Sequence, residues 1–191
     1  MRVIAGTSRG RRLTMFEGRD VRPTPDRVRE ALFSILQSKL GSFSGIKVLD
    51  LFAGSGALAI EALSRGAASA CLVEKDRAAE LVIRKNLNLC KLEEKTTLYI
   101  KDALRCLHEF TAASFDLIFL DPPYFQGLAE QALLETEKQG ILSNDGIICA
   151  ETGSREILPE SVGNLQRIDQ RRYGTIMINF YAHRLMRDRD E

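Results

Sequence analysis

The chain has 191 residues, 45% hydrophobic and 28% charged, values typical of one globular domain with a sizeable core. No apolar run approaches the roughly 20 residues that span a bilayer, and no signal-peptide core follows the N-terminus. We therefore expect a cytoplasmic protein without a membrane partner. The four cysteines are irregularly spaced and there are only two histidines, so we expect neither a metal site nor a histidine-based triad.

The formal net charge of +1 hides an asymmetry between the two ends of the chain. Residues 1–29 carry eight arginines against three acidic residues, which leaves a net negative charge on the remainder. Arginine suits phosphate because its planar guanidinium donates to two oxygens at once. A solvated charged face is the alternative, but we expect an N-terminal RNA contact whose candidate residues are Arg9, Arg11, Arg12 and Arg22.

The sequence of the N-terminal part predicts short strands and turns, followed by a helix. Residues 1–22 combine short apolar runs with glycines that permit tight turns. Thr24 can cap a helix with Pro25 in its first turn, and apolar residues then recur at helical spacing until Gly41. We therefore divide the chain into a small basic β extension, residues 1–22, and a main domain, residues 23–191.

From residue 46 onward, strand and helix patterns alternate. Strand-like runs cover 46–51, 70–73, 96–100, 115–120 and 146–150. Helical spacing covers 57–65, 76–89, 103–110 and 127–138. Two further β-rich runs, 165–173 and 175–183, predict a terminal hairpin. This alternation is typical of a doubly wound, Rossmann-like α/β sheet, in which the loops after the strands meet at one edge.

A glycine-rich turn follows the first strand of this sheet, in Val48-Leu-Asp-Leu-Phe-Ala-Gly-Ser-Gly-Ala-Leu58. Gly54 and Gly56 let the backbone approach a ligand closely, and the next helix supplies N–H groups. The turn also matches the dinucleotide pattern G-x-G-x-x-G/A, and Glu74 stands where a ribose-binding acid belongs. NAD is therefore one candidate ligand.

Asp50 favours a different ligand. A carboxylate at the strand end, facing the turn, would repel a pyrophosphate and attract an ammonium group. S-adenosylmethionine carries an ammonium, a carboxylate and a ribose, and no phosphate. We expect Asp50 to bind its amino group, Gly54 and Gly56 its methionyl part, and Glu74 its ribose hydroxyls.

Three further residues complete the candidate cofactor set on this side of the sheet. Phe52 belongs to the glycine-rich turn itself. Asp102, after the third strand, is placed to reach an adenine amino group, with Ala103 beside the ring. A helix cap explains Asp102 equally well, so both interpretations remain.

The fourth strand, within Phe115-Asp-Leu-Ile-Phe-Leu-Asp-Pro-Pro-Tyr124, ends in a carboxylate, two prolines and an aromatic ring. The prolines lack an N–H, so they stop the sheet and stiffen the backbone. Asp121, the Pro122 carbonyl and the Tyr124 ring would then form a clamp for a planar group that bears an NH2, such as a nucleobase. An acidic turn at a strand end is the alternative.

Several of these segments together resemble the bacterial 16S rRNA guanine-N2 methyltransferase family, named for guanine-966 of the small-subunit RNA. The motifs that carry the resemblance are Arg2–Leu13, Arg22–Phe33, Val48–Leu58, Glu61–Ala67 and Phe115–Tyr124. The resemblance as a whole runs from residue 2 to about residue 182, in the family's order and at the family's length. Pro25 and Lys101 depart from the family pattern, which more often has Thr and Gly there.

The resemblance implies a class I methyltransferase fold with seven strands, the last antiparallel, and S-adenosylmethionine as the cofactor. It also implies that the segment around Thr24 lies over the cofactor and belongs to its binding set. Asp121 would both contact the cofactor and hold the guanine amine, with Pro122 and Tyr124 as its catalytic partners. The expected partner of the basic extension is 16S rRNA within the small ribosomal subunit or its precursor, and the protein is expected to act as a monomer.

Three other classes of function remain as alternatives. An N6-adenine DNA or RNA methyltransferase could use the same clamp, although no separate DNA-recognition segment is evident. A NAD-dependent oxidoreductase would need a proton relay that the scarce histidines do not offer. A non-catalytic RNA-binding module would leave Asp50 and Asp121 without a role.

Overall fold

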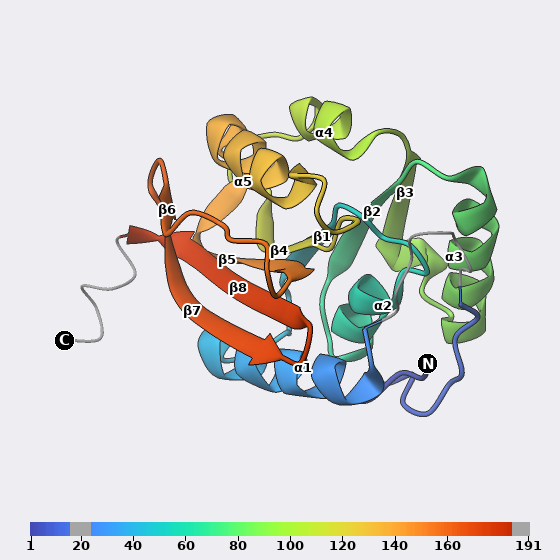
Figure 1. Cartoon of the computed structure of the whole chain (residues 1–191). Helices are drawn as coiled ribbons and strands as arrows, with labels where there is room; N and C mark the ends of the chain where they lie inside the picture. Colours follow the sequence, from blue (N-terminus) through green and yellow to red (C-terminus); the bar gives the residue numbers. More distant parts are fainter. Residues whose placement is uncertain (16–23, 185–191) are drawn as a thin grey trace. The chain divides into compact units, whose positions relative to one another are not determined.

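A computed structural model describes residues 1–15 and 24–184 of the chain. The chain forms two compact units, residues Met1–Asp102 (unit 1) and Ala103–Glu191 (unit 2), and each is described by itself. Figure 1 shows the elements of both units in chain order. Within the described ranges, no helix is both long and apolar enough to cross a membrane.

Unit 1 pairs three parallel strands in the order β3-β2-β1. Its strands are β1 (Lys47–Asp50), β2 (Ser69–Glu74) and β3 (Thr96–Ile100). Its helices are α1 (Asp26–Leu40), α2 (Ala57–Ser64) and α3 (Arg77–Cys90), with a 3-10 turn at Glu93–Lys95. Asp50 pairs with Leu72, and Glu74 pairs with Ile100, so the carboxyl ends of these strands lie at one edge.

Helix α3 begins where the sequence predicted. Asp76 is its N-cap, and the side chain accepts a hydrogen bond from the Ala78 N–H at 2.7 Å. Ala79, Ile83 and Leu87 are buried at helical spacing, so this face packs into the core. The local pattern therefore determines both the start and the buried side of α3.

Helix α1 differs from the prediction at its start. Pro25, not Thr24, is the N-cap, and its carbonyl accepts hydrogen bonds from the Val28 and Arg29 N–H groups. The expected Thr24 cap is therefore wrong. The physical reason is that Pro25 itself has an extended backbone, with φ −56° and ψ 147°, so helical geometry starts at Asp26, one residue later than a Thr24 cap would place it. The helix ends at Gly41 as expected, where φ is +73°.

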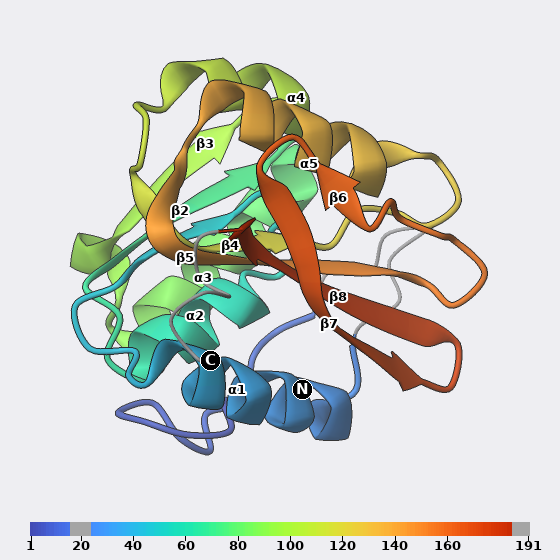
Figure 2. The same ribbon diagram turned by 90° about the vertical axis from the view of Figure 1, so that its left-hand side faces the viewer.

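Unit 2 contains the other strands, in the order β4-β5-β8-β7-β6. These are β4 (Phe115–Leu120), β5 (Leu142–Gly153), β6 (Ser161–Val162), β7 (Leu165–Tyr173) and β8 (Ile176–His183). Strands β4 and β5 are parallel, whereas β8, β7 and β6 are each antiparallel to their neighbour. The helices are α4 (Ala103–Cys106) and α5 (Leu128–Gln139), with a 3-10 turn at Leu107–Glu109, and Figure 2 shows the strands from the side.

The predicted class, an α/β sheet with parallel strands and an antiparallel C-terminal hairpin, is confirmed. Two details differ. Eight strands occur in the described residues rather than seven, because β6 adds a short strand beside β7. Strand β5 begins at Leu142 and not at residue 146, because a register shift between Phe115 and Leu117 of β4 accommodates the turn-like residues of β5.

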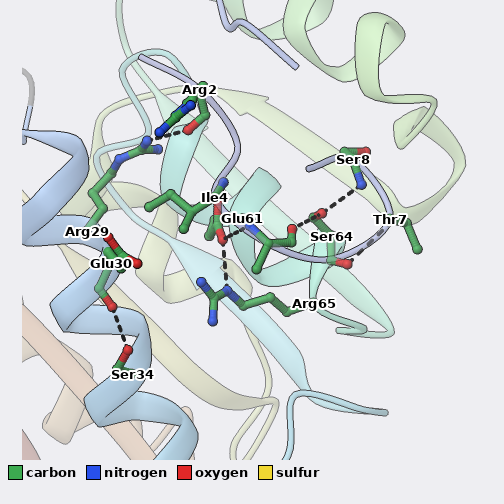
Figure 3. A network of polar contacts seen from close by, with 11 residues as sticks. Arg2, Ile4, Thr7, Ser8, Arg29, Glu30, Ser34, Glu61, Ser64 and Arg65 are labelled. Atoms are coloured by element: carbon green, nitrogen blue, oxygen red, sulfur yellow. Dashed lines mark hydrogen bonds and ion pairs between the residues drawn. The ribbon is translucent and has the colours of Figure 1, made fainter. Parts of the chain in front are cut away.

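The N-terminal residues 1–15 pack against α2 and α3, and they form a single bridge between Arg2 and Arg12 rather than strands. Glu61 of α2 is fully buried and accepts hydrogen bonds from the Ile4 and Ala5 N–H groups, at 2.7 and 3.0 Å. The Ser64 hydroxyl donates to the Ala5 carbonyl at 2.6 Å. Figure 3 shows this network. These hydrogen bonds fix the N-terminal segment on the surface of unit 1.

Candidate functional site

Backbone hydrogen bonds fix the glycine-rich turn after β1. The Ala53 N–H donates to the Val73 carbonyl at 3.0 Å, and the Gly54 N–H donates to the Glu74 carboxylate at 2.9 Å. Gly54 and Gly56 have φ values of +55° and +76°, a region that side-chain-bearing residues rarely adopt. Gly56 is also the N-cap of α2. The sequence therefore needs glycine at both positions to bring this turn beside β2.

Asp50 lies at the end of β1 with only 1% of its surface exposed. Its Oδ2 accepts a hydrogen bond from the Ala59 N–H at 3.3 Å. Its buried Oδ1 has no hydrogen-bond partner among the described residues. Burial, and secondarily the negative charge of Glu74, raise the pKa of Asp50 to about 7, while the Ala59 N–H opposes this shift. An orphaned, buried carboxylate oxygen fits a cationic donor such as an ammonium group.

Glu74 is held by three backbone N–H groups. Its Oε2 accepts from Gly54, and its Oε1 accepts from Lys75 and Asp76 at 2.8 and 2.9 Å. The side chain is half-buried, and a carboxylate has about four lone-pair sites, so a ribose hydroxyl can still donate to it. The carboxylate is thus oriented in advance at the end of β2.

Asn86 of α3 is fully buried and was not predicted from the sequence. Its side-chain amide donates to the carbonyl oxygens of Ser55 and Thr14, both at 2.9 Å. Its Oδ1 accepts from the Thr14 N–H at 2.8 Å. Asn86 therefore connects the glycine-rich turn to the N-terminal segment. The sequence signal that could have identified it is its position among the apolar residues on the buried face of α3, where a polar side chain needs a hydrogen-bond partner.

The remaining cofactor candidates occupy different environments. Phe52 is half-buried within the turn, whereas Thr24 is buried and precedes Pro25, the N-cap of α1. Asp102 is exposed and immediately precedes α4, and Ala103 is buried as its first residue. The geometry thus brings Asp50, Phe52, the two glycines and Glu74 together, and the cofactor-binding roles of all the candidates, including Thr24, Asp102 and Ala103, stay predictions.

In unit 2, the Asp-Pro-Pro-Tyr motif leaves the carboxyl end of β4. Asp121 is half-buried and Pro122 is buried. The Tyr124 hydroxyl donates a hydrogen bond to the carboxylate of Glu151, which is 3% exposed in β5. This contact anchors the Tyr124 ring at the end of the strand pair. Glu151 was not predicted, although an acid directly after the apolar residues 147–150 is a signal that could have identified it.

The predicted RNA contacts lie on the docked N-terminal segment. Arg9 and Arg12 are exposed, and Arg11 is half-buried. Arg22 lies outside the described residues. Because the backbone around these arginines is fixed on α2 and α3, the two exposed side chains project from a defined surface of unit 1.

Comparisons with known proteins give a consistent result. The family model described as "Conserved hypothetical protein 95" matches residues 1–182. "Putative rRNA methyltransferase YlbH" of Bacillus subtilis is 38% identical over 186 residues, which cover 96% of this chain and 100% of the relative. "Ribosomal RNA small subunit methyltransferase D" of Escherichia coli is 34% identical over 190 residues, covering 100% of this chain and 93% of the relative.

A solved structure extends the comparison to the fold. The structure described as "Putative methyltransferase yhhF from Escherichia coli" has a TM-score of 0.81 and 34% identity, over 96% of this chain and 97% of that chain. The likeness therefore spans nearly all of both chains. It confirms the predicted Rossmann-like fold, and the family match confirms the resemblance that the motifs indicated.

Proposed function

The chain belongs to the family described as "Conserved hypothetical protein 95", and from this premise we propose that it methylates the N2 amine of a guanine in 16S rRNA, with S-adenosylmethionine as the methyl donor. The names of the relatives from Bacillus subtilis and Escherichia coli support rRNA, and small-subunit rRNA in the second case, as the substrate class. The observation that carries the choice of donor is the orphaned, buried Oδ1 of Asp50.

The residues of the glycine-rich turn fit S-adenosylmethionine better than NAD. Asp50 and Glu74 place two carboxylates beside the turn, and their repulsion contributes to the raised pKa of Asp50. A pyrophosphate there would add further negative charge, whereas an ammonium group would satisfy Asp50 and favour its ionised form. Glu74 would accept the ribose hydroxyls. When bound, the cofactor supplies an electrophilic sulfonium methyl group.

The Asp-Pro-Pro-Tyr motif would hold the acceptor amine. The lone pair of the guanine 2-amino group is conjugated with the ring, so this nitrogen is a poor nucleophile. Asp121 and the Pro122 carbonyl would accept its two N–H bonds and favour a geometry in which the lone pair is available. Tyr124, anchored by Glu151, would stack on the base. The target base must be unpaired or flipped out to reach the motif.

The basic extension would supply the contact to the RNA backbone. We retain residues 1–22 as this extension and residues 23–191 as the methyltransferase domain. Arg9 and Arg12 are exposed on a segment that hydrogen bonds hold in place, so their binding to phosphate requires little ordering of the backbone. The proposed partner is 16S rRNA in the small ribosomal subunit or its precursor.

Mass mapping of methylated nucleosides tests this function. The protein is incubated with labelled S-adenosylmethionine and either free 16S rRNA or small subunits lacking the modification. We expect N2-methylguanosine at one position, and a rise in the unfolding temperature with S-adenosylmethionine but not with NAD. N6-methyladenosine would instead support the adenine-methyltransferase alternative. Absence of methylation with both substrates, together with no thermal shift, would contradict the proposal.

A further inference from the structure

Phe125, directly after the Asp-Pro-Pro-Tyr motif, is an aromatic residue that the proposed mechanism does not use. It is 66% exposed, which is unusual for a large apolar ring next to a candidate site. Its φ is +61°, a left-handed conformation that is strained for a bulky residue. Such strain persists only where the surrounding structure imposes it, and it is concentrated at functional sites.

Two contacts hold Phe125 in this conformation, one from the segment after β5 and one from Gly153, the last residue of β5. The Phe125 N–H donates to the Glu156 carboxylate at 3.0 Å. Its ring lies against Gly153, where an added Cβ would be only 2.5 Å from the ring. Glycine at position 153 therefore makes room for the ring. The exposed orientation of Phe125 is built into unit 2 and is not a consequence of a loose loop.

The rings of Tyr124 and Phe125 are nearly perpendicular. Their centroids are 6.3 Å apart and their planes meet at 89°. A flat base that stacks on one ring is therefore edge-on to the other, so one base cannot stack on both. If the target guanine stacks on Tyr124, the face of the Phe125 ring remains available for stacking by a different nucleotide.

Basic side chains lie at the same end of unit 2 as Phe125. Exposed Arg155 is in the segment that holds the ring, and the N–H of neighbouring Ser154 donates to the Thr175 carbonyl in the β7–β8 turn at 2.9 Å. Near the end of β7, the exposed Arg172 donates through Nε to the Gly174 carbonyl of that turn at 3.1 Å. Figure 2 shows the loop before α5, the segment after β5 and the β7–β8 turn extending toward the same side.

We propose that Phe125 is a stacking platform for a nucleotide adjacent to the methylated one, with Arg155 and Arg172 contacting the phosphates beside it. An exposed aromatic ring stacks on any base, because every base has a π face. The neighbouring guanidinium groups complement the charge of the RNA backbone. This inference rests on the proposed function, and it assigns to unit 2 an RNA-binding surface separate from the N-terminal arginines.

The first test compares RNA binding by variants of the full chain. The probe is a short fluorescein-labelled RNA centred on the guanine that mass mapping identifies. Phe125→Ala should weaken binding about 5- to 150-fold, the range that corresponds to one stacked base, and leave the thermal shift with S-adenosylmethionine unchanged. Phe125→Trp should restore binding. Leu134→Ala removes another exposed apolar side chain, from α5, and should bind RNA like the wild type.

The second test uses the wild-type protein, so it does not depend on the folding of a variant. Each nucleotide beside the target is replaced in turn by 5-iodouridine, and the complex is irradiated. We expect one position to crosslink to Phe125. The inference would be overturned if crosslinks formed only to other residues, or if Phe125→Ala bound RNA as tightly as the wild type. In either case, methylation by the wild-type protein would still support the proposed function. Loss of methylation by the wild type itself would refute the proposed function instead.

Discussion

Asn86 in α3 donates a hydrogen bond to the Ser55 carbonyl of the glycine-rich turn at 2.9 Å, although the two residues are 31 positions apart in the chain. The same amide nitrogen donates to Thr14 in the N-terminal segment. One buried side chain therefore stabilises two segments whose own sequences are polar and glycine-rich. This links the shape of the proposed cofactor turn to the packing of α3.

Asn86→Ala should both destabilise the protein and weaken binding of S-adenosylmethionine. The substitution leaves three partly buried backbone groups of Ser55 and Thr14 without their partner, which we expect to lower the free energy of unfolding by about 2 kcal/mol. Urea unfolding and the thermal shift with the cofactor measure the two effects. Asn88→Ala is the matched control, because Asn88 lies exposed in the same helix, and equal results for both variants would refute the role of Asn86.

Glu61→Ala should release the N-terminal segment from α2. The buried carboxylate accepts from two backbone N–H groups and pairs with Arg65 at 2.8 Å, so its removal should cost about 3 kcal/mol of unfolding free energy. Hydrogen exchange of the Ile4 and Ala5 amides should become faster. Glu80→Ala breaks a surface pair with Arg84 of the same spacing and should cost less than about 0.5 kcal/mol. Unchanged exchange in Glu61→Ala would contradict this prediction.

Asp50 should make stability depend on pH in the absence of cofactor. Its pKa is about 7 in the folded state against 3.8 for the free side chain, so the folded protein binds the proton more tightly than the unfolded chain. The stability from this group is complete below about pH 4 and is lost as the pH rises toward 7. Asp50→Asn cannot ionise, so its stability relative to the wild type should increase across this window. Equilibrium urea unfolding at successive pH values measures the difference.

The same titration should control the affinity for S-adenosylmethionine. An ammonium group pairs with the ionised carboxylate, whose fraction rises about tenfold between pH 6 and pH 8 for a pKa near 7. The dissociation constant of the wild type should therefore fall by about that factor. Asp50→Asn should bind weakly at both pH values, and a wild-type affinity that is independent of pH would argue against an Asp50–ammonium contact.

Asp121→Ala should abolish methyl transfer while binding of S-adenosylmethionine persists. The proposed role of Asp121 is to accept a hydrogen bond from an N–H of the amine. The methyl side chain of alanine has no acceptor and cannot do this. Single-turnover transfer of a labelled methyl group measures the chemical step, and calorimetry measures cofactor binding. Asp145→Ala replaces an exposed acid of β5 in the same unit and should leave the rate unchanged. Measurable turnover by Asp121→Ala would exclude this mechanism.

Arg9→Ala and Arg12→Ala should each weaken RNA binding without affecting the cofactor. If each side chain contacts one phosphate, the slope of log affinity against log salt should decrease by about 0.7 to 0.9 per substitution. Fluorescence anisotropy at several salt concentrations gives this slope. Lys39→Ala, in the last turn of α1, is a control for the general loss of positive charge. An equal change of slope in all three variants would indicate a diffuse electrostatic effect and not specific contacts.

The sequence by itself determined the features that depend on neighbouring residues. Hydrophobic periodicity predicted the α/β class and most element bounds, including a helix from residue 76, where Asp76 is the N-cap of α3. The paired glycines indicated the turn after β1, and two prolines indicated the end of β4. These signals are local because backbone propensity and capping involve residues within a few positions of one another.

Only the tertiary structure decided which polar side chains position these motifs. Glu61 accepts a hydrogen bond from a residue 57 positions away, and Glu151 accepts one from a residue 27 positions away. Asn86 donates one to a residue 31 positions away. An isolated acid or amide in a helix or strand looks the same in the sequence whether it is solvated or buried. Its partner is set by chain packing, and the cost of burying an unpaired polar group then selects the arrangement in which each is satisfied.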